Sequence, residues 1–337
     1  MQLLKTGVLS FHGFFISVAI VVMLLYAFVY ASKHKFDVST LMYLTPAAIL
    51  FGFAGARLLY VTVCDQEYVD QADKWRFTDG GYSLFGAAAG VVLTAVVWWL
   101  ITKRKQKLLP LFDVICASAP LAIAIGRLGS IFSMDCLGDV VENDGLRFFP
   151  ISIYNNADES FHYAIFFYEA VWCVVIFFFI IYSEEKLKRR GVASYVFAVL
   201  YCGLRSVFES LRTDSMSVGF IMISQIISVF TLIGVFVWMC VKISRLTGFK
   251  PKYLISYGIF TVSFVIAFLS QFFMYSNTKV RNTIIMLICC IVMMAVALYN
   301  GVVYIDESNK KKARKKRLPD KTRRFSRVAP AQTNKGN

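Results

Sequence analysis

The sequence predicts an all-α integral membrane protein that crosses the bilayer about nine times. Hydrophobic residues make up 58% of the 337 residues, only 17% are charged, and the mean hydropathy is +0.61. These values exclude a disordered chain and argue against an ordinary soluble domain. Apolar runs of roughly twenty residues, long enough to cross about 30 Å of hydrocarbon, recur along the whole chain.

The predicted spans follow one another closely. They cover approximately residues 11–31, 43–63, 83–102, 113–133, 163–182, 192–211, 217–241, 253–274 and 283–304. The first could imitate a secretory signal peptide, because Val29-Tyr30-Ala31 has small residues in cleavage-like places. Its apolar run is too long for a signal peptide and only Lys5 precedes it, so we expect a retained helix.

Loop charges predict the orientation of these spans. Every basic cluster follows an odd-numbered span: Lys33 with Lys35, and residues 103–107, 186–190, 242–252 and 310–327. The loops after the second and fourth spans are instead rich in acidic residues. The positive-inside rule therefore puts the N-terminus outside and the C-terminus in the cytoplasm. The same rule accounts for the net charge of +15, so we expect no nucleic-acid partner.

The chain divides into three predicted parts: a membrane domain at 1–242, an added two-helix hairpin at 243–304, and a disordered basic cytoplasmic tail at 305–337. The loop at 134–162 is too long for a simple connection, and its aromatic residues favour a segment on the outer interface. The eight cysteines form no CxxC pair and no His/Cys cluster. We therefore expect no disulfide framework, no metal site and no cofactor.

Arg127 is the first candidate functional residue. It follows an apolar run, Val114–Ile125, with no turn signal between. A charge there lies either at a lipid–water boundary, with its long stem in lipid, or in a protein-lined cavity. Gly126 and Gly129 favour the cavity, because they remove side chains from the helix face beside Arg127 and let a helix or lipid headgroup approach.

Other spans also carry ionisable residues beside apolar runs: Arg57, Asp113 and Glu169, and a group at the end of the sixth span. In that group Arg205, Glu209 and Arg212 stand at i, i+4 and i+7, so they share one helix face. The group could be a structural ion-pair network. Alternatively, a surplus of guanidinium groups in an apolar, outward-facing setting suits a phosphate, which accepts paired hydrogen bonds from arginine. The sequence thus predicts a phospholipid-binding membrane protein.

The order of motifs over about residues 10–242 resembles the prolipoprotein diacylglyceryl transferase family. The motifs that carry the resemblance are Gly55-Ala56-Arg57-Leu58-Leu59-Tyr60, Gly80-Gly81-Tyr82-Ser83 with Gly86, Asp113 with Ala119-Pro120-Leu121, Gly126-Arg127-Leu128-Gly129…Gly138, Tyr168-Glu169, Arg205…Glu209…Arg212-Thr213-Asp214 and Gln225-Ile226-Ile227-Ser228. The resemblance implies a seven-helix transferase-like body in the bacterial cytoplasmic (inner) membrane.

The resemblance implies transfer of the diacylglyceryl group from phosphatidylglycerol to the cysteine thiol of a prolipoprotein signal peptide, at its lipobox, on the outer face. Arg127 and Arg205 would bracket the phosphate, and Glu209 and Arg212 would hold that arrangement. Further substrate-binding positions would be Arg57, Tyr60, Ser83, Ser130, Gly126, Gly129 and Gly138. Membrane lipids would be further partners.

The chain departs from the family pattern where the chemistry would occur. The family's Gly-Gly-Leu-Ser-Phe-His-Gly motif carries a histidine important for activity, and Phe85 stands in its place. General-base help is worth about 10²–10⁴-fold, so we expect a substitute at His12 or Asp135. His12 could equally be a helix-end residue that faces interfacial water. The alternative functions are a non-catalytic paralogue that binds phospholipid or lipoprotein precursors and, less well supported, a transporter.

Overall fold

The structure is a computed structural model that describes residues 11–64, 81–102, 108–215, 217–218, 221–248, 251–272 and 279–317. Nine helices within these ranges are long and apolar enough to cross a membrane. The predicted all-α, multi-pass membrane fold is confirmed. The helices are α1 (Phe11–Lys33), α2 (Val38–Val63), α3 (Leu84–Ile101), α4 (Leu108–Ser133), α5 (Ile165–Leu187), α6 (Val192–Leu211), α7 (Ile223–Thr247), α8 (Pro251–Phe272) and α9 (Lys279–Arg317).

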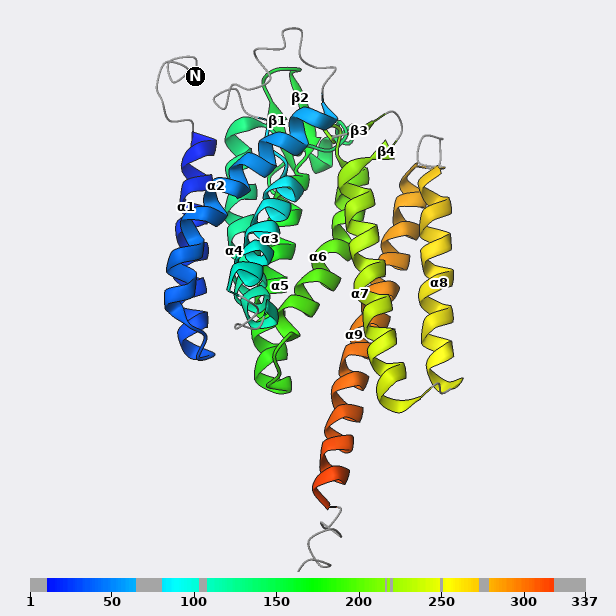
Figure 1. Ribbon diagram of the computed structural model, residues 1–337. Helices are drawn as coiled ribbons and strands as arrows, with labels where there is room; N and C mark the ends of the chain where they lie inside the picture. Colours follow the sequence, from blue (N-terminus) through cyan, green and yellow to red (C-terminus); the bar gives the residue numbers. More distant parts are fainter. Residues whose placement is uncertain are drawn as a thin grey trace, which may run out of the picture.

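Helix α6 lies at the centre of the bundle, between α4 and α5 on one side and α7 and α9 on the other (Figure 1). In the most apolar stretch of α6, 72% of the residues are buried, against 22–44% in the corresponding stretches of the other helices. Its sequence suits this place, because Gly203 lies directly against Met294 of α9. The carboxylate of Asp113 on α4 accepts hydrogen bonds from the backbone N–H groups of Gly191 and Ser194 at the start of α6.

Helices α2 and α3 form a close pair because glycines face one another where they cross. A Cβ on Gly86 would lie 2.3 Å from the carbonyl oxygen of Gly55, and one on Gly90 would lie 2.0 Å from that of Phe51. The two backbones are therefore in contact, and no side chain larger than hydrogen fits between them.

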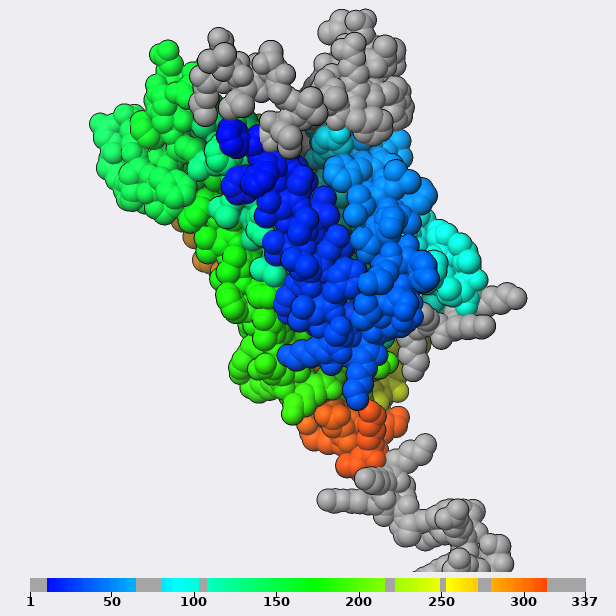
Figure 2. Space-filling model, turned by 90° about the vertical axis from the view of Figure 1, so that its left-hand side faces the viewer, coloured from blue at the N-terminus to red at the C-terminus, as the bar shows by residue number. Residues whose placement is uncertain are grey.

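The loop after α4 folds into a cap over one end of the bundle. It contains a 3-10 turn (Asp144–Leu146) and the antiparallel strands β1 (Ser152–Asn155) and β2 (Ser160–Tyr163). A second short hairpin, β3 (Ser217–Val218) with β4 (Ile221–Met222), lies at the same end, opposite the C-terminal end of α9 (Figure 1). In Figure 2 the cap, in green, projects beyond the bundle at the upper left, on the side of α1 away from α2.

His162 of β2 links two segments of the cap by hydrogen bonds. Its Nδ1 lies 2.8 Å from the carbonyl oxygen of Gly138, and its Nε2 lies 2.6 Å from a carboxylate oxygen of Asp158. Both partners only accept hydrogen bonds, so the doubly protonated imidazolium satisfies both. Burial lowers the pKa of His162, but these two hydrogen bonds outweigh it and raise the pKa above its ordinary value.

Helix ends differ from the predicted spans by a few residues, and at two places the kind of structure differs as well. The seventh span was expected from residue 217, but Ser217 and Val218 pair with the strand Ile221–Met222 before α7 begins. Short apolar runs do not distinguish strand from helix, which explains the error. Helix α9 continues to Arg317, so residues 305–317 are helical rather than part of a disordered tail. No glycine or proline interrupts residues 302–317, and Lys310 pairs with Asp306 one turn earlier. Residues 318–337 lie outside the described part.

Candidate functional site

The predicted arginines of α4 and α6 meet at the end of the bundle that the cap covers. Arg127 comes from the last two turns of α4, Arg205 from the second half of α6, and Arg212 from the residue that follows α6. Their side chains are 15%, 3% and 11% exposed, respectively. We call these three residues, together with Glu169, Glu209 and Asp214, the arginine cluster.

Glu169 of α5 joins two of the guanidinium groups. One of its carboxylate oxygens, Oε2, lies 2.9 Å from Nε of Arg127 and 2.6 Å from Nη1 of Arg205. The hydroxyl of Tyr201 donates to the other oxygen at 3.2 Å. The Glu169 side chain is 1% exposed, so two helices, α4 and α6, are connected through one buried carboxylate on a third.

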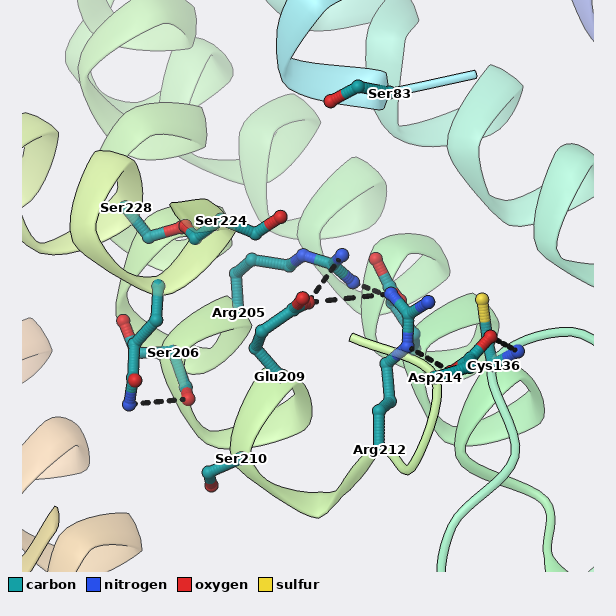
Figure 3. Close-up of polar contacts among 12 residues, drawn as sticks. Ser83, Cys136, Arg205, Ser206, Glu209, Ser210, Arg212, Asp214, Ser224 and Ser228 are labelled. Atoms are coloured by element: carbon teal, nitrogen blue, oxygen red, sulfur yellow. Dashed lines mark hydrogen bonds and ion pairs between the residues drawn. The ribbon is translucent and has the colours of Figure 1, made fainter. Parts of the chain in front are cut away.

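Glu209 connects the remaining arginine to the cluster (Figure 3). Its Oε2 lies 2.8 Å from Nη2 of Arg205 and 3.4 Å from Nη1 of Arg212. The shared helix face is therefore confirmed for Arg205 and Glu209, whereas Arg212 reaches Glu209 from the extended residue that follows α6. Nε of Arg212 also donates to Asp214 at 3.0 Å. Burial raises the pKa of Asp214, but Arg212 outweighs it and holds that pKa below its usual value.

The expected surplus of guanidinium groups does not occur within the arginine cluster. Its three arginines lie against three carboxylates. Counting charges along separate spans could not show this, because Glu169, which pairs with both Arg127 and Arg205, comes from another helix, α5. The ion pairs balance the cluster, since an uncompensated buried charge is strongly destabilising.

The cap contributes a neutral acceptor to the cluster. Nη1 of Arg127 donates to Sγ of Cys136 at 2.8 Å, and the thiol side chain is buried. The backbone N–H of Cys136 donates to Asp214 at 2.7 Å, as Figure 3 shows. Gly138, two residues later, forms an antiparallel bridge with Arg212. A Cβ there would lie 3.0 Å from Tyr163 and Ile165, so the glycine lets this segment pack closely.

The small residues beside Arg127 have different surroundings. A Cβ on Gly129 would lie 2.6 Å from Phe15 of α1, so a neighbouring helix approaches there. Around Gly126 the same Cβ would meet no atom within 4 Å in the described part of the chain. Ser130 is buried at 2% exposure. The helix face therefore admits α1 at one glycine and is open at the other.

Arg57, Tyr60 and Ser83 form a second group, where α2 meets the start of α3. Arg57 is 1% exposed and donates to the carbonyl oxygen of Gly81 at 3.2 Å. The Tyr60 ring packs against Gly81, which has a positive φ of 72°. Ser83 caps the start of α3 and lies apart from the arginine cluster in Figure 3.

His12 and Asp135 lie outside the arginine cluster in the described structure. Nδ1 of His12 lies 3.2 Å from the Ser133 hydroxyl, and His12 is also near Gly129. Asp135 is exposed, next to Cys136 in sequence. Phe85 lies in the first turn of α3, two residues after Ser83, and is partly buried.

Sequence reasoning gave no role to Glu169, Tyr201, Asp214 or Cys136. The signal for Glu169 was present, because a glutamate inside an apolar span needs a buried cation. Which cation it meets is decided by how α5 packs against α4 and α6. Within the described ranges, no three His, Cys, Asp or Glu side chains are close enough together to hold a metal ion.

Comparison with known proteins extends the resemblance. The family model described as prolipoprotein diacylglyceryl transferase matches residues 2–241. The phosphatidylglycerol–prolipoprotein diacylglyceryl transferase of Thermotoga petrophila is 32% identical over 191 residues, which cover 55% of this chain and 65% of that protein. The same-named proteins of Clostridium botulinum (strain Langeland) and Clostridium novyi are 31% and 27% identical, covering 56% and 72% of this chain and 73% and 95% of their own lengths.

The chain thus spans about two thirds of the length of the Thermotoga relative, and nearly all of the Clostridium novyi protein. The match of the family model covers α1 to α7 almost completely and stops before α8. By this match, the chain belongs to the prolipoprotein diacylglyceryl transferase family.

Proposed function

We propose that the protein transfers the diacylglyceryl group of phosphatidylglycerol to the cysteine thiol of a prolipoprotein lipobox. The observation that carries the proposal is the pairing of Arg127 and Arg205 on one buried carboxylate, Glu169. That carboxylate fixes both guanidinium planes before a ligand arrives. Prearranged donors of this kind stabilise charge that develops in a transition state without reorganisation. The names of the related proteins state the same reaction.

In this reaction the thiol sulfur forms a bond to the glyceryl carbon, and the bond from that carbon to a phosphate oxygen breaks. Glycerol phosphate leaves with the electron pair. Arg127 and Arg205 would stabilise the negative charge that gathers on it, while Glu209 and Arg212 hold Arg205 in place.

The remaining predicted site residues would bind and orient the substrates. Arg57, Tyr60 and Ser83, at the junction of α2 and α3, would border the lipid headgroup, and Gly126, Gly129, Ser130 and Gly138 would line its approach to Arg127. The thiol proton must pass to a base, and Phe85 cannot accept it. We assign this role to His12 or Asp135, which the experiment below separates.

The test measures transfer of labelled diacylglyceryl from phosphatidylglycerol to a lipobox peptide in nanodiscs. Arg127→Ala and Arg205→Ala should each lower the rate about 10²–10³-fold, as loss of one donor to a developing anion does. Lysine at either position should restore only part of the rate lost in the alanine variant, because lysine lacks the planar guanidinium group that donates two parallel hydrogen bonds. Arg147→Ala, which removes an arginine of the cap outside the arginine cluster, is the matched control and should leave the rate unchanged.

The base is identified in the same assay between pH 6 and 9. His12→Ala or Asp135→Ala should lower the rate about 10²–10⁴-fold if that residue accepts the thiol proton. Phe85→His should raise the rate of a chain that has no base. An unassisted thiol, with a pKa of about 8.5, would still react weakly and faster as the pH rises. Background rates in both the wild type and Phe85→His, with phosphatidylglycerol still bound, would contradict the proposed reaction.

We place the site at the outer face of the bacterial cytoplasmic membrane, with the C-terminus in the cytoplasm. Loop charges support this orientation, and the cap and the end of α9 lie at opposite ends of the bundle. A membrane-impermeant thiol reagent applied to intact cells should modify a cysteine placed at Asn143, which is exposed in the cap, and spare one at Gln332. The reverse labelling pattern would overturn the orientation.

A further inference from the structure

Cys136 of the cap contacts the arginine cluster but takes no part in the reaction described above. Its side chain is 3% exposed, and its Sγ accepts a hydrogen bond from Nη1 of Arg127 at 2.8 Å. Arg127 is also the most exposed arginine of the cluster, at 15% against 3% for Arg205 and 11% for Arg212. Cys136 therefore contacts the most exposed of the three arginines.

The acceptor at this position differs in kind from the others. The ion pairs of Arg127, Arg205 and Arg212 in the described structure are all with carboxylates, whereas Cys136 presents a neutral thiol. A thiol sulfur is a weak acceptor, whereas hydrogen bonds to ionised oxygens are about twice as strong as neutral ones. Of these bonds, the one to Cys136 costs least to exchange for a bond to a phosphate oxygen.

The thiol is held in place by the backbone rather than by Arg127. The N–H of Cys136 donates to Asp214 at 2.7 Å, and the N–H of Thr213 donates to the carbonyl oxygen of Leu137 at 3.0 Å. Cys136 has a φ of 62°, in the left-handed region that few non-glycine residues adopt. The loop thus fixes the sulfur beside Nη1 at some conformational cost.

The thiol also remains neutral near neutral pH. Burial raises the pKa of Cys136 by more than Arg127 and Arg212 lower it. Glu169 is shared between Arg127 and Arg205, so Arg127 has only part of one counterion. A neutral thiol at Nη1 leaves the attraction of Arg127 for a second anion undiminished.

We infer that Cys136 keeps Nη1 of Arg127 available for phosphate: its thiol is a weak, neutral acceptor of the Nη1 hydrogen bond and yields it to a phosphate oxygen when that group binds. The inference deepens the proposed function and rests on it. The bond from Nε of Arg127 to Glu169 stays in place during the exchange, so the guanidinium keeps its orientation. The ligand chemistry is a phosphate ester, supplied either by a lipid headgroup or by free glycerol phosphate.

The test compares Cys136→Asp with Cys136→Asn. Both side chains have the same shape and tolerate a left-handed backbone, and they differ in charge. A fixed aspartate would neutralise Nη1 permanently, so affinity for sn-glycerol phosphate and for phosphatidylglycerol in nanodiscs should fall about tenfold or more, while asparagine should change it about threefold or less. Cys136→Ala should bind as tightly as the wild type. Retention of uncharged diacylglycerol should be the same in all variants, which a general structural defect would not allow.

Equal affinities of the aspartate and asparagine variants would overturn the inference, as would a loss in Cys136→Ala as large as in Arg127→Ala. If Cys136→Asp does not fold, Cys136→Ser replaces it: its hydroxyl is a stronger acceptor than the thiol and should bind phosphate more weakly than Cys136→Ala. Comparing the affinities for phosphatidylglycerol and for sn-glycerol phosphate shows whether the site binds a lipid headgroup or a free phosphate ester. An Asp–Asn difference in a chain that transfers no diacylglyceryl would uphold this inference and refute the proposed reaction. A wild type that binds neither ligand would refute the inference.

Discussion

Glu169→Gln is expected to be the most destabilising conservative change in the arginine cluster. The substitution keeps the size of the side chain and removes its charge, while Arg127 and Arg205 stay buried beside it. Removing one partner of a buried ion pair costs about 3–5 kcal/mol, because the remaining charge has lost its counterion. Arg205 still meets Glu209, whereas Arg127 pairs with the Glu169 carboxylate in the described structure, so Arg127 should carry most of the penalty.

Thermal unfolding in detergent micelles measures this cost. With about 2.1 cal/mol/K of unfolding entropy per residue, 337 residues give about 1.4 °C of Tm for each kcal/mol, so the Tm should fall by about 4 °C or more. Glu185→Gln, at an exposed position on the same helix, is the matched control and should leave Tm nearly unchanged. Combining Glu169→Gln with Arg127→Gln should recover part of the loss, with a coupling of about 0.5–3 kcal/mol.

The reasoning is refuted if Glu169→Gln unfolds within about 1 °C of Glu185→Gln, since the buried carboxylate would then not be what compensates the guanidinium groups. A double variant that is less stable than Glu169→Gln alone would also contradict it. In that case Arg127 would contribute stability independently of the charge it faces.

Two further predictions concern packing and pH. Gly90→Ala should destabilise the α2–α3 pair by about 1–3 kcal/mol in thermal unfolding, because its Cβ would lie 2.0 Å from a backbone oxygen, while Gly234→Ala, with open surroundings, should be neutral or stabilising. His162 has a raised pKa in the folded protein, so its contribution to stability is complete below the unfolded value of about 6.5 and is lost as the pH rises through the folded value. Tm should therefore decline between about pH 6 and 8, and His162→Gln should flatten that part of the profile; an unchanged slope would show that another group titrates.

Most of the fold could be predicted from the sequence, because spanning a bilayer constrains composition directly. Each of the nine helices coincides with a run of apolar residues. The exceptions lie where that constraint ends. At residues 217–222 a short apolar run pairs as strands, and beyond residue 304 helix propensity carries α9 onward after its apolar run has ended. Hydropathy reports which residues are in lipid and not where hydrogen bonding of the backbone changes.

The candidate site could be predicted only along single helices. Residues four apart must meet on a helix, so Arg205 and Glu209 were paired correctly. Contacts between helices have no such spacing rule, which is why the sequence predicted no partner for Glu169 and no role for Cys136. Both depend on how α5 and the cap approach α4, and that is decided by packing over the whole bundle.

Charge balance in the cluster is compatible with a phosphate site, because the ion pair of Arg127 and its contact with phosphate would use different nitrogen atoms. A guanidinium carries five N–H donors in a planar fork, and one carboxylate oxygen occupies only part of it. Glu169 takes Nε of Arg127, and the neutral sulfur of Cys136 takes Nη1. The ion pairs stabilise the cluster in its apolar setting. Nη1 of Arg127 can still donate to a phosphate, because its partner, the Cys136 sulfur, is a weak acceptor. The sequence suggested a surplus of positive charge. The structure instead has one arginine, Arg127, whose Nε is paired with a carboxylate and whose Nη1 is available to a phosphate.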